Sequence, residues 1–299
     1  MSRAVLLVSH GTVDDLDDLG AFVSNVRRGH APAPAVIAEV RRRYEAIGGR
    51  SPLNAITAEI ASKLASRLGV RVAWANRLWK PYVRDVLADL ARGGVTRVAL
   101  VPLAQHSAGV YAEDARGPAE ASGVALACSE NWGRLGSLCR AFASRIVRTL
   151  GAGEGLDRTL LTMTAHSLPR AVVDRGDPYE REVRAAADAI GALVGDRLGR
   201  PVPFTVAFQS QGLSGGMEWL GPTLQQALDE AKLREFERVV VAPVGFLADH
   251  VEVLYDVDIE ARAQAAERGL TLDRTPSLNA DDDLVEIVAE VSRPLLDHG

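Results

Sequence analysis

The chain has 299 residues, of which 47% are hydrophobic and 24% are charged. This composition is typical of a soluble globular protein with a full core, and the length suits two domains or one large α/β unit. The net charge of −5 argues against a general nucleic-acid-binding surface, because such a surface needs an excess of basic residues.

The two cysteines, Cys128 and Cys139, form no CxxC motif and cannot by themselves supply a metal or iron–sulfur site. Their number fits a reducing compartment. The N-terminal apolar run is too short for a signal peptide, and no apolar stretch approaches the roughly 20 residues that span a bilayer. We therefore expect a cytoplasmic protein without an integral membrane segment.

Short apolar runs rich in β-branched residues alternate with segments of helical periodicity along the chain. In chain order, the predicted strands cover residues 4–9, 70–74, 97–102, 159–164, 204–208 and 238–243. The helical patterns between them cover residues 51–68, 82–92, 137–150, 179–198 and 223–235. This alternation predicts an α/β fold whose parallel sheets are covered by helices on both faces.

The order of these elements repeats. The stretch "VAWANRLWKPYVRDVLADLARGGVTRVALVPLAQH" corresponds to "VAFQSQGLSGGMEWLGPTLQQALDEAKLREFERVVVAPVGFLADH", because each gives a strand, a Trp-bearing loop, a helix and a strand followed by a histidine. We predict two similar lobes, 1–150 and 151–299, with the boundary near the glycines of "GAGEG" at 151–155. The C-terminal helix could pack back on the first lobe.

Four of the six histidines follow predicted strands: His10, His106, His166 and His250. Functional groups of open α/β sheets lie at the carboxyl ends of the strands, so these positions favour chemistry. The alternative, a core histidine satisfied by the backbone, holds for most histidines. For His166 the following Ser and Pro indicate an abrupt exit from the strand, where an imidazole could accept a proton or bind a metal near neutral pH.

The segment "ADHVEVLYDVDIE" contains a row of acidic residues: Asp249, Glu252, Asp256 and Glu260. Spacings of three, four and four residues bring them to roughly one face of a helix, where like charges repel. A solvated acidic face is one reading, with Asp249 as N-cap or in the first turn. However, valines and a leucine alternate with the acids, and partly buried acids usually need a cation, for which oxygen ligands suit hard divalent ions.

Arginines cluster locally in this acidic chain at Arg27, Arg28, Arg41–Arg43 and Arg50. Surface solubilisation explains any one of them about as well as function does. As a group beside a binding site they could engage carboxylates through two hydrogen bonds each.

Five collinear blocks together resemble the ferrochelatase family, whose members insert ferrous iron into a porphyrin. They read "NVRRGH…RRYEAIGGRSPLNAIT", "VALVPLAQHS", "TAHSLP…GDPYEREV", "VAFQSQG…EWLGP" and "VAPVGFLADHVEVLYDVDIE". The wording is most similar to the soluble coproporphyrin III enzymes of Gram-positive bacteria. The resemblance implies two flavodoxin-like (Rossmann-type) lobes with four-stranded parallel sheets, the chelatase-like fold, and an active site in the cleft between the lobes.

The resemblance also implies roles for individual residues. His166 of "AHSLP" and Glu252 of "DHVEVLYD" match the catalytic pair at the metal-insertion site, and we expect His166 to act as base and Glu252 as metal ligand or proton shuttle. Asp256 and Glu260 match acidic positions on a helix with a π-type widening, where they could hold a hydrated divalent ion such as Mg²⁺.

Further matches concern the porphyrin. Arg27, Arg28 and Ser51 match the lip that meets the macrocycle and its propionates. Gln209 and Trp219 match positions on the wall of the binding cleft.

The sequence departs from the pattern of the Gram-positive enzymes at His10, where they carry a tyrosine. An imidazole at this position could be the axial metal ligand and contact the porphyrin, and it is similar to the "GHGS" start of small cobalt and sirohydrochlorin chelatases. A Lys-His pair that the family can use as an outer metal site is replaced by Arg77 and Leu78. We expect no iron–sulfur cluster and no prosthetic group, with Fe²⁺ as substrate.

These features predict a monomeric lyase of haem biosynthesis that inserts Fe²⁺ into coproporphyrin III, with transient contacts to other enzymes of the pathway. The alternatives are protoporphyrin IX as substrate, a cobalt or nickel chelatase for another tetrapyrrole, and a non-catalytic tetrapyrrole-binding protein. The basic lip favours coproporphyrin, because four propionates need more cationic partners than two.

Overall fold

The computed structural model describes residues 2–151, 155–212 and 216–297, and the chain divides into two compact units. The first unit comprises residues 1–132 and 279–299, and the second comprises residues 133–278. The expected boundary at 150/151 is therefore replaced by one at 132/133. The reason is that the helix at 136–150 packs against the helix at 179–198 and the strand at 238–242, which belong to the second unit. Most of the expected glycine linker at 151–155 lies outside the described residues.

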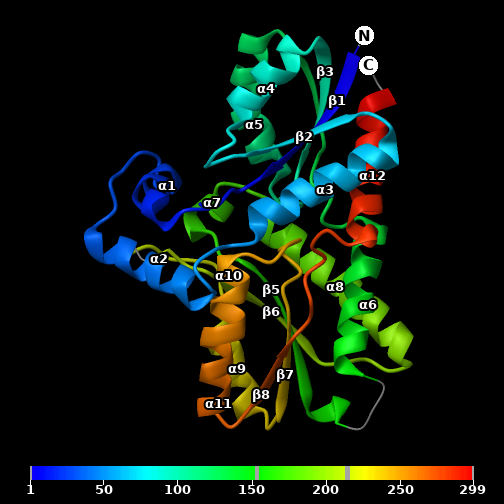
Figure 1. Ribbon diagram of the computed structural model, residues 1–299. Helices are drawn as coiled ribbons and strands as arrows, with labels where there is room; N and C mark the ends of the chain where they lie inside the picture. The colour runs from blue at the N-terminus through cyan, green and yellow to red at the C-terminus, as the bar shows by residue number, and fades with distance from the viewer. Residues whose placement is uncertain (1, 152–154, 213–215, 298–299) are drawn as a thin grey trace. The chain divides into compact units, whose positions relative to one another are not determined.

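The first unit contains β1 (Ser2–Ser9), the 3-10 helix η1 (Leu16–Asp18), α1 (Leu19–Val26), α2 (Pro34–Ala46), α3 (Leu53–Leu68), β2 (Arg71–Asn76), α4 (Val83–Arg92), β3 (Val95–Pro102), α5 (Ala108–Ser122), β4 (Ala125–Cys128) and α12 (Asp282–Asp297). Its four strands are parallel in the order β2-β1-β3-β4. Helices α3 and α12 cover one face of this sheet, and α4 and α5 cover the other (Figure 1).

The second unit contains α6 (Gly136–Leu150), the 3-10 helix η2 (Leu156–Arg158), β5 (Thr159–His166), α7 (Arg170–Asp174), α8 (Tyr179–Leu198), β6 (Phe204–Gln209), α9 (Leu224–Leu233), β7 (Arg238–Ala242), α10 (Val251–Leu254), the π-helix η3 (Asp256–Ala261), α11 (Arg262–Glu267) and β8 (Thr271–Arg274). Its strands are parallel in the order β6-β5-β7-β8, the same order as in the first unit. The α/β class with two similar four-stranded parallel sheets is thus confirmed.

Burial explains why the strands read as continuous apolar runs. In β1, residues 4–9 are all buried, as expected for a parallel strand covered on both faces. The edge strands β4 and β8 were not predicted. Each has only four residues, too few to give a strand signal, and their backbone partners in β3 and β7 define them.

The two units also share the connection that follows the second strand of each sheet. The amide of Asn76 donates to Pro81 O at 2.7 Å, and the amide of Phe208 donates to Pro222 O at 2.8 Å. Both prolines follow cis peptide bonds. The sequence repeat is therefore a structural repeat that includes this loop.

None of the helices in the described part of the chain is both long enough and apolar enough to cross a membrane.

The turn after β7 lies unusually close to β5. The Gly245 amide donates to Thr164 O at 2.9 Å, and a Cβ on Gly245 would lie 2.4 Å from Ala165 Cβ and 2.6 Å from Ala165 Cα. Only glycine fits this contact, because a methyl group there would meet backbone-linked atoms that cannot rotate away. The turn leads into α10, so this contact positions the helix relative to the end of β5.

We predict that Gly245→Ala destabilises the protein by about 1–3 kcal/mol, the typical cost of overpacking a filled site. Gly117→Ala in α5 is the matched control, since a Cβ there meets nothing within 4 Å and alanine favours a helix. Thermal and urea unfolding of both variants measure the difference. A Gly245→Ala protein as stable as wild type would contradict the close contact.

Candidate functional site

His166 and Glu252 form an ion pair at the carboxyl end of β5. His166 Nδ1 lies 3.2 Å from Glu252 Oε2, and the two side chains are 37% and 35% exposed. Nδ1 itself is buried and has no aligned hydrogen-bond partner among the described residues, so the contact with Glu252 is electrostatic rather than directional. The exposed part of the ring therefore lies away from Nδ1.

His250 is the second histidine beside Glu252. Its Nε2 lies 3.6 Å from Glu252 Oε2, its Nδ1 is 3.1 Å from Ala248 O, and its ring packs against Phe246 with centroids 4.8 Å apart. The sequence indicates His250 only as one of the four histidines that follow predicted strands. The contact with Glu252 shows that it also contributes to the electrostatics of the candidate catalytic carboxylate.

These contacts displace the pKa values of the pair in opposite directions. Burial alone would lower the pKa of His166, but the nearby carboxylates of Glu252 and Asp256 outweigh it and raise the pKa above 6.5. Burial opposes ionisation of Glu252, yet His166 and His250 hold its pKa well below 4.5. The contact therefore favours the protonated form of His166 and the ionised form of Glu252.

The stability that this pair contributes depends on pH in two ways. Since the pKa of Glu252 is lowered on folding, its contribution is lost in acid, as pH falls through the folded-state pKa. Since the pKa of His166 is raised, its contribution is complete below 6.5 and is lost as pH rises through the higher folded-state value.

Backbone contacts hold both members of the pair. The Gln209 side-chain amide donates to Glu252 O at 2.9 Å, and Tyr179 Oη donates to His166 O at 2.9 Å. The Ser167 amide donates to Gln209 O at 2.7 Å and continues the ladder between β5 and β6 past His166. Gln209, which is predicted to contact porphyrin, is 4% exposed. Its hydrogen bond to Glu252 O also holds the start of α10 in place.

The predicted acidic row is rearranged by the local backbone. Asp249 is not the N-cap of α10, which begins after His250; instead Asp249 accepts from Arg274 Nη1 at 3.1 Å and from Ser277 Oγ at 2.7 Å. The expectation that Asp249 caps or opens the helix is therefore wrong, because the Arg274 guanidinium and the Ser277 hydroxyl provide a better partner set than helix amides.

The remaining acids continue along η3. The amide of Glu260 donates to Tyr255 O at 2.9 Å, the i→i−5 bond of a π-helix, which confirms the widening implied by the resemblance. Asp256 is 7% exposed and accepts a 2.5 Å hydrogen bond from Ser210 Oγ. Ser210 adopts φ +62°, a left-handed conformation that is uncommon outside glycine, so the end of β6 is strained where it meets Asp256.

No group of three or more His, Cys, Asp or Glu side chains within residues 2–151, 155–212 and 216–297 is arranged to hold a metal ion. His166 and Glu252 form an open pair instead. An open pair suits a metal that arrives and leaves as substrate, because a closed set of protein ligands would retain it.

In the first unit, the exposed His10 follows β1 at its carboxyl end. A buried network anchors this segment: Ser9 Oγ donates to Asn76 Oδ1 at 2.6 Å, Asn76 Nδ2 donates to Asn54 Oδ1 at 3.0 Å, and Asn54 Nδ2 donates to Thr12 O at 3.0 Å. Sequence reasoning missed these asparagines, since a neutral buried network has no charge pattern. Whether His10 joins the pair at one metal stays a prediction.

His106 also follows a strand, but it is 4% exposed and burial lowers its pKa to about 4. It is therefore neutral at physiological pH. Its pKa is displaced in the opposite direction from that of His166.

Arg27 and Arg28, predicted to contact propionates, are exposed after α1. Within the described residues neither side chain forms an ion pair, whereas the neighbouring arginines do: Arg41 with Asp17, Arg42 and Arg43 with Glu39, and Arg50 with Asp14. Arg27 and Arg28 thus keep their charge available to an outside anion.

The other predicted porphyrin contacts have different surroundings. Ser51 is 1% exposed, so its role as a lip residue stays a prediction. Trp219 is half-buried, pairs with Pro169 in an isolated bridge three residues after His166, and lies so close to Gly212 that a Cβ there would approach its ring to 2.8 Å. Arg77 is paired with Asp114 at 2.5 Å.

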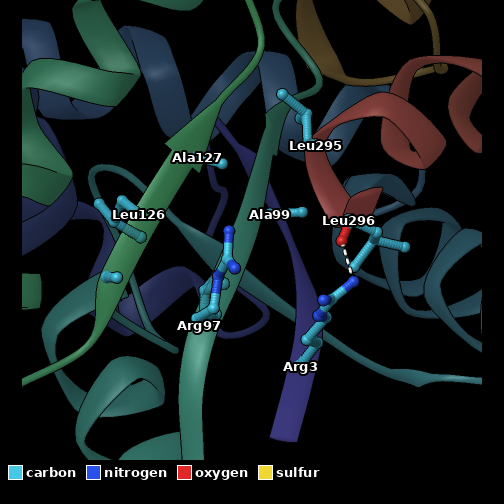
Figure 2. A pocket seen from close by; sticks show the side chains of 9 residues that line it. Arg3, Arg97, Ala99, Leu126, Ala127, Leu295 and Leu296 are labelled. Carbon is cyan, nitrogen blue, oxygen red and sulfur yellow. Dashed lines mark hydrogen bonds between the residues drawn. The ribbon is translucent and has the colours of Figure 1, made fainter. Parts of the chain in front are cut away.

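A cavity of about 110 Å³ lies at the opposite end of the first sheet from His10 (Figure 2). Arg3 and Arg97, near the starts of β1 and β3, and Leu295 and Leu296 of α12 are among its lining residues. It is not the candidate site, since none of the predicted site residues lines it.

Comparison with known proteins identifies the family and the fold of the chain. The ferrochelatase family model matches residues 2–295. The chain is 36% identical to a ferrochelatase of Acidobacterium capsulatum over 98% of this chain and 94% of that protein. It is 32% identical to a coproporphyrin III ferrochelatase of Anoxybacillus flavithermus, with 97% and 96% of the two chains covered.

Among solved structures, SirB from Bacillus subtilis with Fe³⁺ has a TM-score of 0.60 at 14% identity, covering 99% of this chain and 96% of that one. This likeness shows the chelatase fold. With the family model spanning nearly every residue, the chain belongs to the ferrochelatase family of metal chelatases, lyases that insert ferrous iron into a porphyrin.

Proposed function

We propose that this ferrochelatase acts on coproporphyrin III, with His166 and Glu252 as its catalytic pair and Arg27 and Arg28 as propionate ligands. The observation that carries the substrate assignment is the pair of exposed arginines without ion-pair partners in the described residues, beside arginines that are paired. A guanidinium binds a carboxylate through two hydrogen bonds, so these residues suit a porphyrin rich in propionates. The name of the Anoxybacillus flavithermus relative supports the same substrate.

Metal insertion requires removal of two pyrrole protons and loss of water from the iron. His166 accepts a proton only after it has lost its own, and its raised pKa places this event above pH 6.5. Glu252 is ionised throughout this range and is a suitable ligand for an arriving cation. An iron ion beside Glu252 would repel the proton on His166, which links metal arrival to the formation of the base.

Asp256 and Glu260 are proposed to guide the hydrated metal, and they could also hold Mg²⁺. Both offer carboxylate oxygens on η3 as metal ligands. The Asp256 carboxylate is held by a hydrogen bond from Ser210 Oγ. His10 is proposed as an axial ligand. A monomeric state, a cytoplasmic location and transient contacts with haem-pathway enzymes remain predictions.

The substrate assignment is tested by a matrix of metals and porphyrins under anaerobic conditions. We expect the highest kcat/KM for Fe²⁺ with coproporphyrin III, followed by protoporphyrin IX, measured by the absorption of the metallated product. A preference for protoporphyrin IX would overturn the substrate assignment. Activity only with cobalt or nickel would overturn the proposal for iron.

Replacing Arg27 and Arg28 together by alanine should raise the KM for coproporphyrin III by roughly 25-fold, with a smaller effect on kcat. Each lost charge-assisted hydrogen bond at an exposed site is worth on the order of 1 kcal/mol, about a fivefold change. Arg42→Ala is the control, because Arg42 is exposed but already paired with Glu39. An equal KM for the double variant and wild type would exclude these arginines from binding.

Glu252→Gln should lower the pKa of His166, because the carboxylate that outweighs the cost of burial is removed. The imidazole Cε1–H resonance, followed by NMR as a function of pH, measures the change. Glu260→Gln is the matched control, since Glu260 is not among the groups that shift His166. A His166 pKa that is unchanged in Glu252→Gln would contradict the coupling of the pair.

A further inference from the structure

Four buried polar atoms lie along the second half of β5 and at the carboxyl end of β6. They are Thr162 Oγ1, Thr164 Oγ1, His166 Nδ1 and Gln209 Oε1, and none has a hydrogen-bond partner among the described residues. Both threonines are 0% exposed and Gln209 is 4% exposed. Leaving such a group unsatisfied is costly, and native proteins usually satisfy a buried polar group with a protein partner or an ordered water.

The four atoms lie on one face of the sheet. Alternate residues of a strand point to the same side, so Thr162, Thr164 and His166 share a face of β5. The parallel register places Gln209 beside His166, and its amide reaches Glu252 O on the same side.

The π-helix lies over this face. Leu160, two residues before Thr162, packs in one apolar cluster with Val257 and Ala261 of η3 and with Val239 and Val241 of β7. The threonine hydroxyls thus lie between this apolar cluster and His166. They form a closed polar layer rather than an opening to solvent, because both side chains are fully buried.

We propose that Thr162, Thr164 and Gln209 bind a small group of ordered waters beneath η3, and that Thr164 is thereby a positioning residue for the His166 imidazole. The inference rests on the proposed catalytic role of His166. Glu252 lies at ion-pair distance from Nδ1 without alignment for a hydrogen bond, so it attracts the ring but does not fix its plane. A water bonded to Thr164 Oγ1 and Nδ1 supplies that direction.

The chemistry of the layer favours water over a cation. Threonine hydroxyls both donate and accept, and the Gln209 carbonyl oxygen accepts, so neutral donors satisfy all three. None of these three side chains carries the negative charge that a buried cation needs as a partner.

Two substitutions separate the hydroxyl of Thr164 from its volume. Thr164→Val keeps the shape and removes the hydroxyl, whereas Thr164→Ser keeps the hydroxyl and removes a methyl group. We expect kcat for Fe²⁺ insertion to fall about tenfold or more in Thr164→Val, the usual effect of losing a group that orients a catalytic histidine, with KM for the porphyrin unchanged. Thr164→Ser should stay within about twofold of wild type, since a serine hydroxyl offers the same hydrogen bonds.

A purely structural role predicts the reverse order, because valine fills the site and serine leaves a cavity. That order, or wild-type kcat in Thr164→Val, overturns the inference. Thr159→Val is the control on the same strand, where the hydroxyl faces the other side and donates to Gly155 O. Thermal unfolding of each variant checks that it folds.

High-resolution crystal structures of wild type and Thr164→Val provide a readout independent of activity. We expect ordered water bonded to Thr164 Oγ1 in wild type and its loss in the variant. If the wild-type structure shows no ordered water at Thr164 Oγ1, the inference is overturned. This test does not depend on whether Thr164→Val folds. If wild type inserts no iron, the proposed function fails, while the water structure still decides whether Thr164 binds water beside His166.

Discussion

The contact of Gly245 with β5 is the constraint on which the candidate site depends. Its amide is held by Thr164 O at 2.9 Å, and the missing side chain allows the turn after β7 to lie against Ala165. The chain then enters α10 beside the end of β5, and Glu252 arrives 3.2 Å from His166. Two residues 86 positions apart in the chain thus become one electrostatic unit through a backbone contact.

The charges of this unit favour a protonated His166, which must lose its proton in the proposed reaction. The raised pKa of His166 and the lowered pKa of Glu252 stabilise the charged pair in the resting protein. In the proposed reaction, an arriving divalent cation competes with the imidazolium for the same carboxylate. In this proposal, metal and proton exchange at one site. The orientation of the His166 ring then matters for the exchange, and the buried hydroxyl layer under η3 is proposed to help fix that orientation.

The two units apply one fold to different tasks. Both sheets have the same strand order, and in both a proline carbonyl accepts a hydrogen bond from a backbone amide in the last two residues of the second strand. At the carboxyl end of the first sheet the polar groups are neutral, a serine and asparagines that anchor the segment with His10. At the equivalent end of the second sheet they are charged. The repeat fixes where functional groups lie, and local substitutions decide their chemistry.

The sequence alone determined the fold class and the family, because periodicity, internal repetition and five collinear motifs are local properties of the chain. It also selected His166 and Glu252 as the candidate pair. It also placed six of the eight strands; β4 and β8 are defined by backbone pairing with distant neighbours. Only the tertiary structure decided that α6 belongs with the second unit, since that depends on which apolar faces meet. It also decided that Asp249 binds Arg274 instead of continuing the acidic row along the helix. Arg27 and Arg28 form no ion pair among the described residues, whereas the neighbouring Arg42 does. Threonine hydroxyls of β5 lie buried on the same strand as His166. Partner choice and burial arise from residues far apart in sequence, and no local pattern records them.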